Sequence, residues 1–190
     1  MNRAFIFISI LLCMLLTSQA NANNETLKLV LNNLSKIKHI EASFKDIKII
    51  SLFDKKSVLT GNLEYIAPDV LVRRTLKPQK EIFKVKGDNL YLKNSTGKEL
   101  ELLVSSYPLI EMFVEAYRGI LSGDLIKLQN FYNIDFKGNP EQWIISLVPI
   151  DDDGLEYIEE IIVNGHKDDV VKFTTIESSG DMSILNITKK

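Results

Sequence analysis

Apolar and polar side chains alternate at every second residue through most of the chain after residue 39, and a helical pattern interrupts this alternation in one stretch only. After the first strand candidate, the alternating runs are residues 62–66, 70–76, 81–86, 90–93, 142–148, 158–163, 170–176 and 182–188. Pro, Gly and Asn lie between these runs, as is typical of the short connections in antiparallel sheets. We therefore expect one long antiparallel sheet, and a sheet with this many strands tends to curl.

The first strand candidate, residues 40–49, changes its phase in the middle. Ala42 and Phe44 occupy even positions, whereas Ile47 and Ile49 occupy odd positions. A β-bulge after Phe44 is the usual cause of such a shift, so a bulge is expected there. Residues 55–57, Lys-Lys-Ser, are expected to form the polar turn that follows.

Three segments have apolar residues at helical spacing. Residues 26–37 predict an opening helix that covers an apolar surface. Residues 105–121 predict a helix in mid-chain, where Ser105 or Ser106 can cap the first turn and Pro108 suits it, and a shorter helix follows. Helices inserted between two sets of strands can fold into the trough of a curled sheet and cover it.

Residues 1–22 have the pattern of a secretory signal peptide. Arg3 supplies a positive start, residues 4–16 are almost unbroken apolar sequence, and Ala20-Asn21-Ala22 gives the small-x-small cleavage pattern. A membrane anchor is the competing interpretation, but the apolar run is shorter than the ~20 residues that a spanning helix needs. We expect the mature chain to begin at Asn23 and to form one domain, residues 23–190.

Candidate catalytic and metal-binding residues are few. The single cysteine, Cys13, lies in the proposed signal peptide, so the mature chain has neither a thiol nucleophile nor a disulfide. His39 and His166 lie outside any recognisable motif, and residues 151–154 lack the alternating acids and the final Glu of a calcium loop. We therefore expect no enzyme activity, no metal and no cofactor. The 23 basic and 25 acidic residues form no basic stripe, which argues against a nucleic-acid partner.

Several strand candidates are apolar on both faces. Val70 and Val72 lie opposite Leu71, and residues 82–85 show the same arrangement. One apolar face can pack on the helices, whereas a second one needs another layer, a partner or a ligand. An ordinary two-layer core is the alternative that this pattern leaves open.

The stretch between Gly61 and Asn94 has a specific order of motifs. It reads Gly61-Asn62-Leu63-Glu64-Tyr65, Pro68, Val70-Leu71-Val72-Arg73, Pro78, Ile82 and Gly87-Asp88-Asn89-Leu90-Tyr91-Leu92. This order resembles the outer-membrane lipoprotein carrier family of the LolA type, in which a Gly-x-Leu strand, two prolines around an aliphatic-aromatic strand, and a Gly before a Leu-aromatic pair follow one another. The second half of the chain is similar to a LolA-related branch rather than to the main carriers.

The resemblance implies an α+β fold, in which a curved antiparallel sheet forms an open (incomplete) β-barrel with a helical lid over an apolar cavity. It implies a periplasmic carrier that accepts the acyl chains of a lipoprotein or another acylated lipid from an inner-membrane donor complex and delivers them to an outer-membrane acceptor. We expect such a carrier to be a monomer. The alternative is an envelope regulator or sensor that uses the same fold to bind a protein partner.

Alternation along the strands and the helix selects the residues that we expect to line this cavity. They are Leu63, Tyr65, Leu71, Phe83, Val85, Leu90, Leu92, Met112, Phe113, Trp143, Ile145 and Leu147. Arg73 and Arg74 are expected to contact an anionic head group. The chain departs from the family at Ala67, where an Arg often precedes the first Pro, and at Arg73, where an aromatic residue is usual. These departures leave open whether the cargo is a lipoprotein, a glycolipid or another acylated product.

Overall fold

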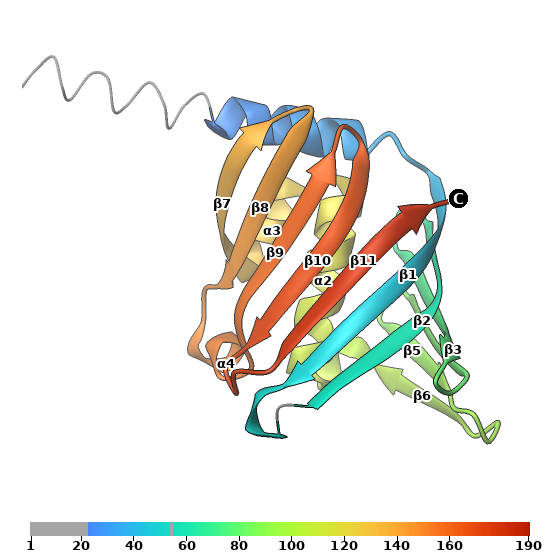
Figure 1. The fold of residues 1–190 in the computed structure, drawn as a ribbon. Coiled ribbons are helices and arrows are strands. Elements are labelled where there is room, and N and C mark those ends of the chain that lie inside the picture. Colours follow the sequence, from blue (N-terminus) through green and yellow to red (C-terminus); the bar gives the residue numbers. More distant parts are fainter. Residues whose placement is uncertain (1–22, 54) are drawn as a thin grey trace, which may run out of the picture.

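The computed structural model describes residues 23–53 and 55–190, so the proposed signal peptide lies outside the described residues. One antiparallel sheet of 11 strands dominates the fold. The strands are β1 (His39–Ile50), β2 (Lys55–Ile66), β3 (Val70–Lys77), β4 (Glu81–Lys86), β5 (Asn89–Lys93), β6 (Glu99–Leu103), β7 (Tyr132–Asn139), β8 (Gln142–Pro149), β9 (Ile158–His166), β10 (Asp169–Glu177) and β11 (Met182–Lys189). The sheet is strongly curved but does not close on itself (Figure 1), which confirms the expected α+β fold with an open barrel.

The strand order is β6-β5-β4-β3-β2-β1-β11-β10-β9-β8-β7. Neighbouring strands are consecutive in the sequence except β1 and β11, which pair at the centre of the sheet from Ala42–Lys189 to Ile49–Met182. The two edges of the sheet are β6 and β7, and the helical segment of residues 104–131 connects them. The sheet is therefore a meander that is left open at the place where its helices are inserted.

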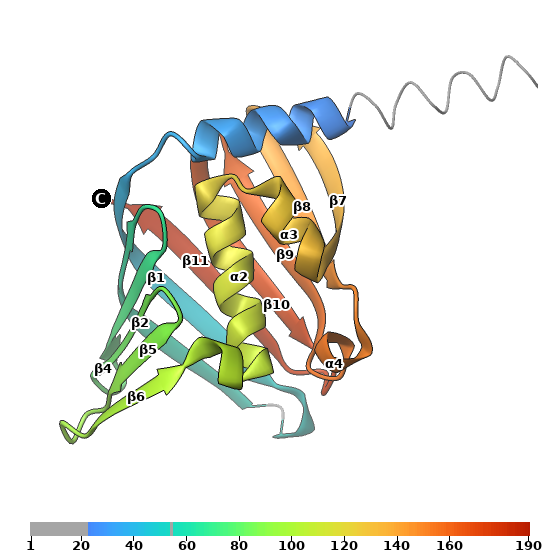
Figure 2. The ribbon, with the colours of Figure 1, turned by 180° about the vertical axis from the view of Figure 1, so that it is seen from behind.

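The helices lie on the concave side of the sheet and at both of its ends (Figure 2). They are the N-terminal helix (described over residues 23–34), η1 (Ser51–Phe53), η2 (Val104–Ser106), α2 (Pro108–Ser122), α3 (Leu125–Phe131) and α4 (Asp152–Leu155). Of these, α2 runs along the concave face, and the N-terminal helix lies across the end of β7–β10 (Figures 1 and 2). None of the described helices is long and apolar enough to span a membrane.

The hydrophobic core is divided into two clusters of unequal size. The larger one lies between the helices and the half of the sheet that contains β7–β11. Its largest buried side chains include Trp143, Tyr132, Phe173, Leu31, Leu34, Ile145 and Leu147. The smaller one joins β4 and β5 to η2 and α2 through Val85, Leu90, Val104 and Val114. The two clusters are thus on opposite sides of α2.

The predicted bulge after Phe44 is wrong. The register of β1 runs without a shift against both β2 and β11, so the alternation continues and Asp46 follows Ala42 and Phe44 onto the concave face. The register shift lies instead between Thr60 and Gly61, where β2 pairs with β3. A Cβ atom at Gly61 would collide with the Arg74 carbonyl oxygen and with the ring of Phe44, so a glycine fits this close approach.

The predicted turn at residues 55–57 is wrong because these residues lie within a strand, and one glycine also lies within a strand and not in a turn. Residues 55–57 begin β2, and the chain reverses before them, at η1. Gly165 lies inside β9. A glycine is needed there because the indole of Trp143 packs directly over it and leaves no room for a side chain. The reversal comes two residues later, where Lys167 has a positive φ of 55°.

Two strands had no counterpart among the predicted elements. They are β6, where Leu100 and Leu102 alternate with glutamates, and β7, where Tyr132, Ile134 and Phe136 alternate with polar residues. Both strands adjoin the helical segment of residues 104–131, and the helical spacing of apolar residues in that segment obscures the alternation in the two strands. The expected serine cap of α2 is also wrong: the Ser105 hydroxyl bonds Asp88 at 2.7 Å, and the helix begins at Pro108 without a side-chain cap.

Candidate functional site

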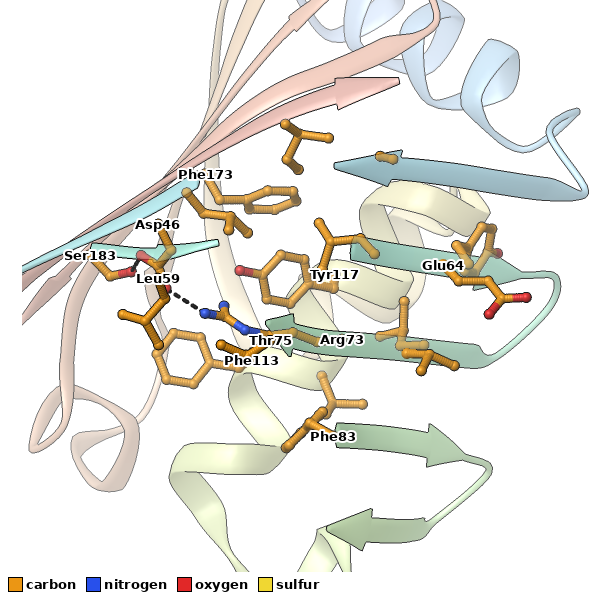
Figure 3. Close-up of a pocket in the computed structure, with 18 of the residues that line it drawn as sticks. Asp46, Leu59, Glu64, Arg73, Thr75, Phe83, Phe113, Tyr117, Phe173 and Ser183 are labelled. Atoms are coloured by element: carbon orange, nitrogen blue, oxygen red, sulfur yellow. Dashed lines mark hydrogen bonds and ion pairs between the residues drawn. The ribbon is translucent and has the colours of Figure 1, made fainter. Parts of the chain in front are cut away.

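A cavity of about 670 Å³ lies between α2 and the concave face of the sheet. Its walls come from β1–β5, β10 and β11 on the sheet and from one side of α2 (Figure 3). Most of the lining is apolar: Ile40, Ala42, Leu59, Leu63, Tyr65, Leu71, Val72, Ile82, Phe83, Leu92, Leu109, Phe113, Val114, Tyr117, Leu121, Val170, Phe173, Leu185 and Ile187. The volume is within the range of roughly 300–1,000 Å³ that is usual for sites binding small organic ligands.

Half of the residues that the sequence selected for a cavity lie on this wall. These are Leu63, Tyr65, Leu71, Phe83, Leu92 and Phe113. The other half are buried in the two core clusters and do not line the cavity: Val85, Leu90, Met112, Trp143, Ile145 and Leu147. Alternation identifies the concave face of each strand, but it does not tell which part of that face a helix covers. Hence the strand residues point inward as expected, while helices and η2 fill the space in front of several of them.

One compact polar cluster interrupts the apolar wall. The carboxylate of Asp46, which is 0% exposed, accepts hydrogen bonds of 2.7 Å from Nη2 of Arg73 and of 2.7 Å from the Ser183 hydroxyl. The guanidinium of Arg73 also lies over the ring of Phe44, with 4.4 Å between its carbon and the ring centroid. A buried carboxylate is costly unless it is paired and hydrogen-bonded, and here both of its oxygens are satisfied.

Tyr117 of α2 lies beside this cluster. Its ring packs against Phe173 with a centroid distance of 4.2 Å, and its hydroxyl points toward Asp46 and Arg73 (Figure 3). Burial raises the pKa of the phenol far above its usual range, although the nearby charge of Arg73 acts in the opposite direction. Within residues 23–53 and 55–190, no protein group forms a hydrogen bond with this hydroxyl. The phenol is therefore a neutral donor that faces the cavity.

Neither Asp46 nor Tyr117 was selected from the sequence. Asp46 was missed because the expected bulge placed it on the outer face, although the unbroken alternation of Ala42, Phe44 and Asp46 was a usable signal. Tyr117 was missed because it lies next to Ala116, at the margin of the apolar stripe of α2, and not within it. Asp46 belongs to the polar minority of the lining, and Tyr117 adds a polar hydroxyl to a mostly apolar side chain; a search for apolar faces detects neither polar group.

The two arginines that were expected to contact a head group lie on opposite faces of β3. Arg73 lines the cavity, but Asp46 neutralises its charge. Arg74 lies on the outer face and donates a hydrogen bond of 2.8 Å to Glu64. That hydrogen bond, together with the charge of Arg74, holds the pKa of the Glu64 carboxyl below its usual range. A shared head-group site for the two arginines does not fit this arrangement.

Arg118 connects the middle of α2 to the far half of the sheet. Its Nε and Nη2 atoms donate to the Asp69 carbonyl at 3.1 and 2.9 Å, and Nη2 also donates to the Gly87 carbonyl at 2.5 Å. These carbonyls belong to the β2–β3 and β4–β5 turns. Glu115 lies 3.2 Å from Nη1 of Arg118 and 2.7 Å from Nζ of Lys127, so the buried charges are compensated. The helix is thus fastened to the turns that bound the cavity.

Among the described residues, one group has the composition of a metal site. Potential ligand atoms of His39, Glu41 and Glu64 lie within 4.8 Å of one another. His39 and Glu41 are exposed, and Glu64 already forms an ion pair with Arg74. Exposed acidic groups beside a histidine are common without a metal, and this group lies on the outer face of the sheet, away from the polar cluster of the cavity.

A curved antiparallel sheet with a helix fastened over an apolar internal cavity defines a class of binding proteins, in which a sheet encloses a ligand and no catalytic constellation is required. The chain belongs to the family described as outer membrane lipoprotein carrier protein LolA-like, whose model matches residues 19–186. This confirms the resemblance that the motifs between Gly61 and Asn94 indicated.

The solved structures that match this chain are distant in sequence. A LolA superfamily protein from Nitrosomonas europaea matches with 10% identity and a TM-score of 0.44, over 86% of this chain and 91% of its own. A putative outer membrane lipoprotein-sorting protein domain from Vibrio parahaemolyticus has 10% identity and a TM-score of 0.46, over 88% and 93%. A chain of the Pseudomonas aeruginosa MucA/MucB complex has 10% identity and a TM-score of 0.46, over 85% and 55%. A search of curated proteins finds no match.

Proposed function

We propose that this protein is a periplasmic carrier that holds the acyl chains of a lipoprotein or another acylated lipid and moves them from the inner to the outer membrane. The observation that supports this proposal is the 670 Å³ cavity, whose wall is mostly apolar. Each buried CH₂ group stabilises a complex by about 0.8 kcal/mol, so an acyl chain has a strong preference for such a cavity over water. The expected signal peptide agrees with a location in the periplasm.

A carrier must also release its cargo, and the packing around the cavity is suited to that. Among the described residues, the cavity lies between the two buried clusters, and only the small cluster joins α2 to β4 and β5. Displacement of β3–β5 from α2 would open the cavity and leave the larger cluster unchanged. We infer that this displacement accompanies loading from an inner-membrane donor and delivery to an outer-membrane acceptor.

The first experiment is to purify residues 23–190 from an envelope extract without detergent and to identify bound lipids by mass spectrometry. We expect about one acylated molecule per protein. In a matched pair of variants, Leu71→Trp fills the cavity, whereas Ile144→Trp adds the same side chain at an exposed position of β8. Loss of bound lipid in Leu71→Trp alone supports the proposal, and a lipid-free wild type that also takes up no fluorescent fatty acid contradicts it.

A second function, binding of a protein partner by an envelope regulator, is favoured by the edge of the sheet at β6. In the described part of the chain this strand pairs only with β5, and its Leu100 and Leu103 are about half exposed. An unpaired strand edge can accept an added strand from another protein. Crosslinking from position 101 to an envelope protein in a variant with a filled cavity would favour this function over lipid transport.

A further inference from the structure

The polar cluster of the cavity has hydrogen-bond donors to spare. Both oxygens of Asp46 are occupied, one by Arg73 and the other by Ser183. Arg73 uses only Nη2 in this pair, and in the part of the chain that the structure describes no oxygen accepts from its Nε or Nη1. A guanidinium has five N–H donors, so most of them remain available at the cavity wall. The hydroxyl of Tyr117 adds a neutral donor beside them.

The net charge of the cluster is zero, because the buried carboxylate of Asp46 balances Arg73. The remaining ionisable residues of the lining provide no surplus of positive charge either. Three lysines, Lys48, Lys93 and Lys189, are matched in number by three carboxylates, Glu81, Asp169 and Glu177. In addition, Lys93 and Lys189 form ion pairs of 2.7 and 2.6 Å with Glu99 and Asp169. At the polar cluster, a ligand that brings its own negative charge would lose hydration and meet an arginine whose charge Asp46 already balances.

We propose that the cavity selects acyl chains whose carbonyl is neutral, as in an ester or an amide, and that this carbonyl accepts hydrogen bonds from Arg73 and Tyr117. Free fatty-acid carboxylates are discriminated against. This inference depends on the proposed carrier function and specifies its cargo: the acyl chain is linked to a larger molecule through an uncharged carbonyl. The role of Asp46 is to neutralise Arg73 without occupying all of its donors.

Displacement of a fluorescent apolar probe by methyl laurate and by laurate tests the inference, because the two ligands share one acyl chain and differ in the head, a neutral methyl ester in one and a carboxylate in the other. At pH 8 we expect the wild-type protein to bind methyl laurate at least about tenfold more tightly than laurate, which corresponds to about 1.4 kcal/mol. Equal binding, or tighter binding of laurate, would overturn the inference while leaving the carrier proposal intact. If neither ligand displaces the probe and no lipid copurifies, both fail.

Substitution of the cluster sharpens this test. Asp46→Asn leaves the charge of Arg73 without its counter-ion, so the preference should shift about tenfold toward laurate. The control is Asp135→Asn, which removes the same charge at an exposed position of β7 and should leave the preference unchanged. Equal shifts in both variants would overturn the assignment.

Tyr117→Phe removes one donor and keeps the ring against Phe173. We expect this variant to bind methyl laurate about fivefold more weakly while its affinity for the apolar probe is unchanged. Unchanged ester binding would remove Tyr117 from the site. The wild-type comparison and this variant remain decisive if Asp46→Asn does not fold.

Discussion

The two sides of α2 show how one sheet can serve two purposes. On the side of β7–β11, large side chains such as Trp143 and Ile145 are almost completely buried. On the side of β2–β5, the buried side chains form the small cluster around Val85 and Leu90, and the 670 Å³ cavity separates this cluster from the inward side chains of β10 and β11. Strand alternation is the same on both sides, so the sheet itself does not produce the difference.

The difference comes from the helices that cover each half. The N-terminal helix, α2 and α3 all pack on the half that contains β7–β11, whereas only α2 and η2 face the other half. Close packing stabilises the first half as a scaffold, and incomplete packing makes the second half available to a ligand. Fewer helical residues cover the curved sheet on the second side, so a cavity remains there that a ligand can fill. The predictions below test this division, beginning with the largest expected effect.

Replacement of Trp143 by Ala should destabilise the protein by about 3–5 kcal/mol, because the side chain is 1% exposed and its loss leaves a large void. The substitution also removes the 2.8 Å hydrogen bond from the indole N–H to the Lys167 carbonyl. Urea unfolding measures the loss. Ile144→Ala, at the adjacent exposed position of β8, is the control and should cost less than about 1 kcal/mol. Similar costs for the two variants would argue against a scaffold in this half.

Replacement of Arg118 by Met should cost about 2–3 kcal/mol, because two carbonyls lose their charged donor and Glu115 keeps only Lys127 as a partner. The effect should be local, with faster amide hydrogen exchange in β3–β5 than in the wild type and little change in β8–β10. Arg118→Lys, which keeps the charge but not the fork of donors, should be intermediate. Uniformly faster exchange across both halves would contradict the inference that Arg118 holds the strands on the cavity side against α2.

Replacement of Phe83 by Ala should cost only about 1–2 kcal/mol of stability, since this side chain is partly buried and already borders a cavity. Lipid uptake, however, should weaken about fivefold or more, because the ring forms part of the apolar wall. Urea unfolding and probe titration on the same sample separate the two effects. The expected pattern is the reverse of that for Trp143→Ala, measured under conditions where that variant is folded. A large stability loss with normal uptake would contradict the division.

Replacement of Arg74 by Gln should have the smallest effect, about 0.5 kcal/mol at pH 7, because its ion pair with Glu64 is on the outer face. The pKa of Glu64 is lowered in the folded state, so the pair stabilises the protein above the unfolded-state pKa and is lost as the pH falls through the folded-state pKa. The difference from wild type should therefore vanish between about pH 5 and pH 3. Unfolding curves at pH 7 and pH 3 check this, and a constant difference would assign the effect to packing.

Much of the fold could be predicted from the sequence, because both the hydrophobic period and the turn residues are local signals. The inward faces of β2–β5 and β8 were expected, and the αL conformation of Gly123 after α2 follows from its position at the helix end. The strands β6 and β7 were missed because they lie beside helical residues. For these elements the neighbouring strand, and not the local pattern, decides the structure.

The site was less predictable than the fold. Which concave residues face a void depends on where α2 and the N-terminal helix come to rest, and this is a property of the whole molecule. Asp46 illustrates the limit: a carboxylate on an inward face is stable only because Arg73 and Ser183 reach it from residues 27 and 137 positions away in the chain. A rule that assigns every polar side chain to the outer face of a strand therefore predicts a bulge after Phe44 that the structure does not contain.

The pairing of β1 with β11 has a consequence for the time course of folding. Phe44 lies opposite Ile187, so the central ladder of the sheet forms only when segments more than a hundred residues apart meet. Closing so large a loop costs more chain entropy than forming the neighbouring hairpins, and folds rich in such distant pairs assemble slowly. Two hairpin arrays would then exist before they join. Since β1, β10 and β11 all contribute to the cavity, we expect the ability to bind a ligand to appear in the final, slowest phase of refolding.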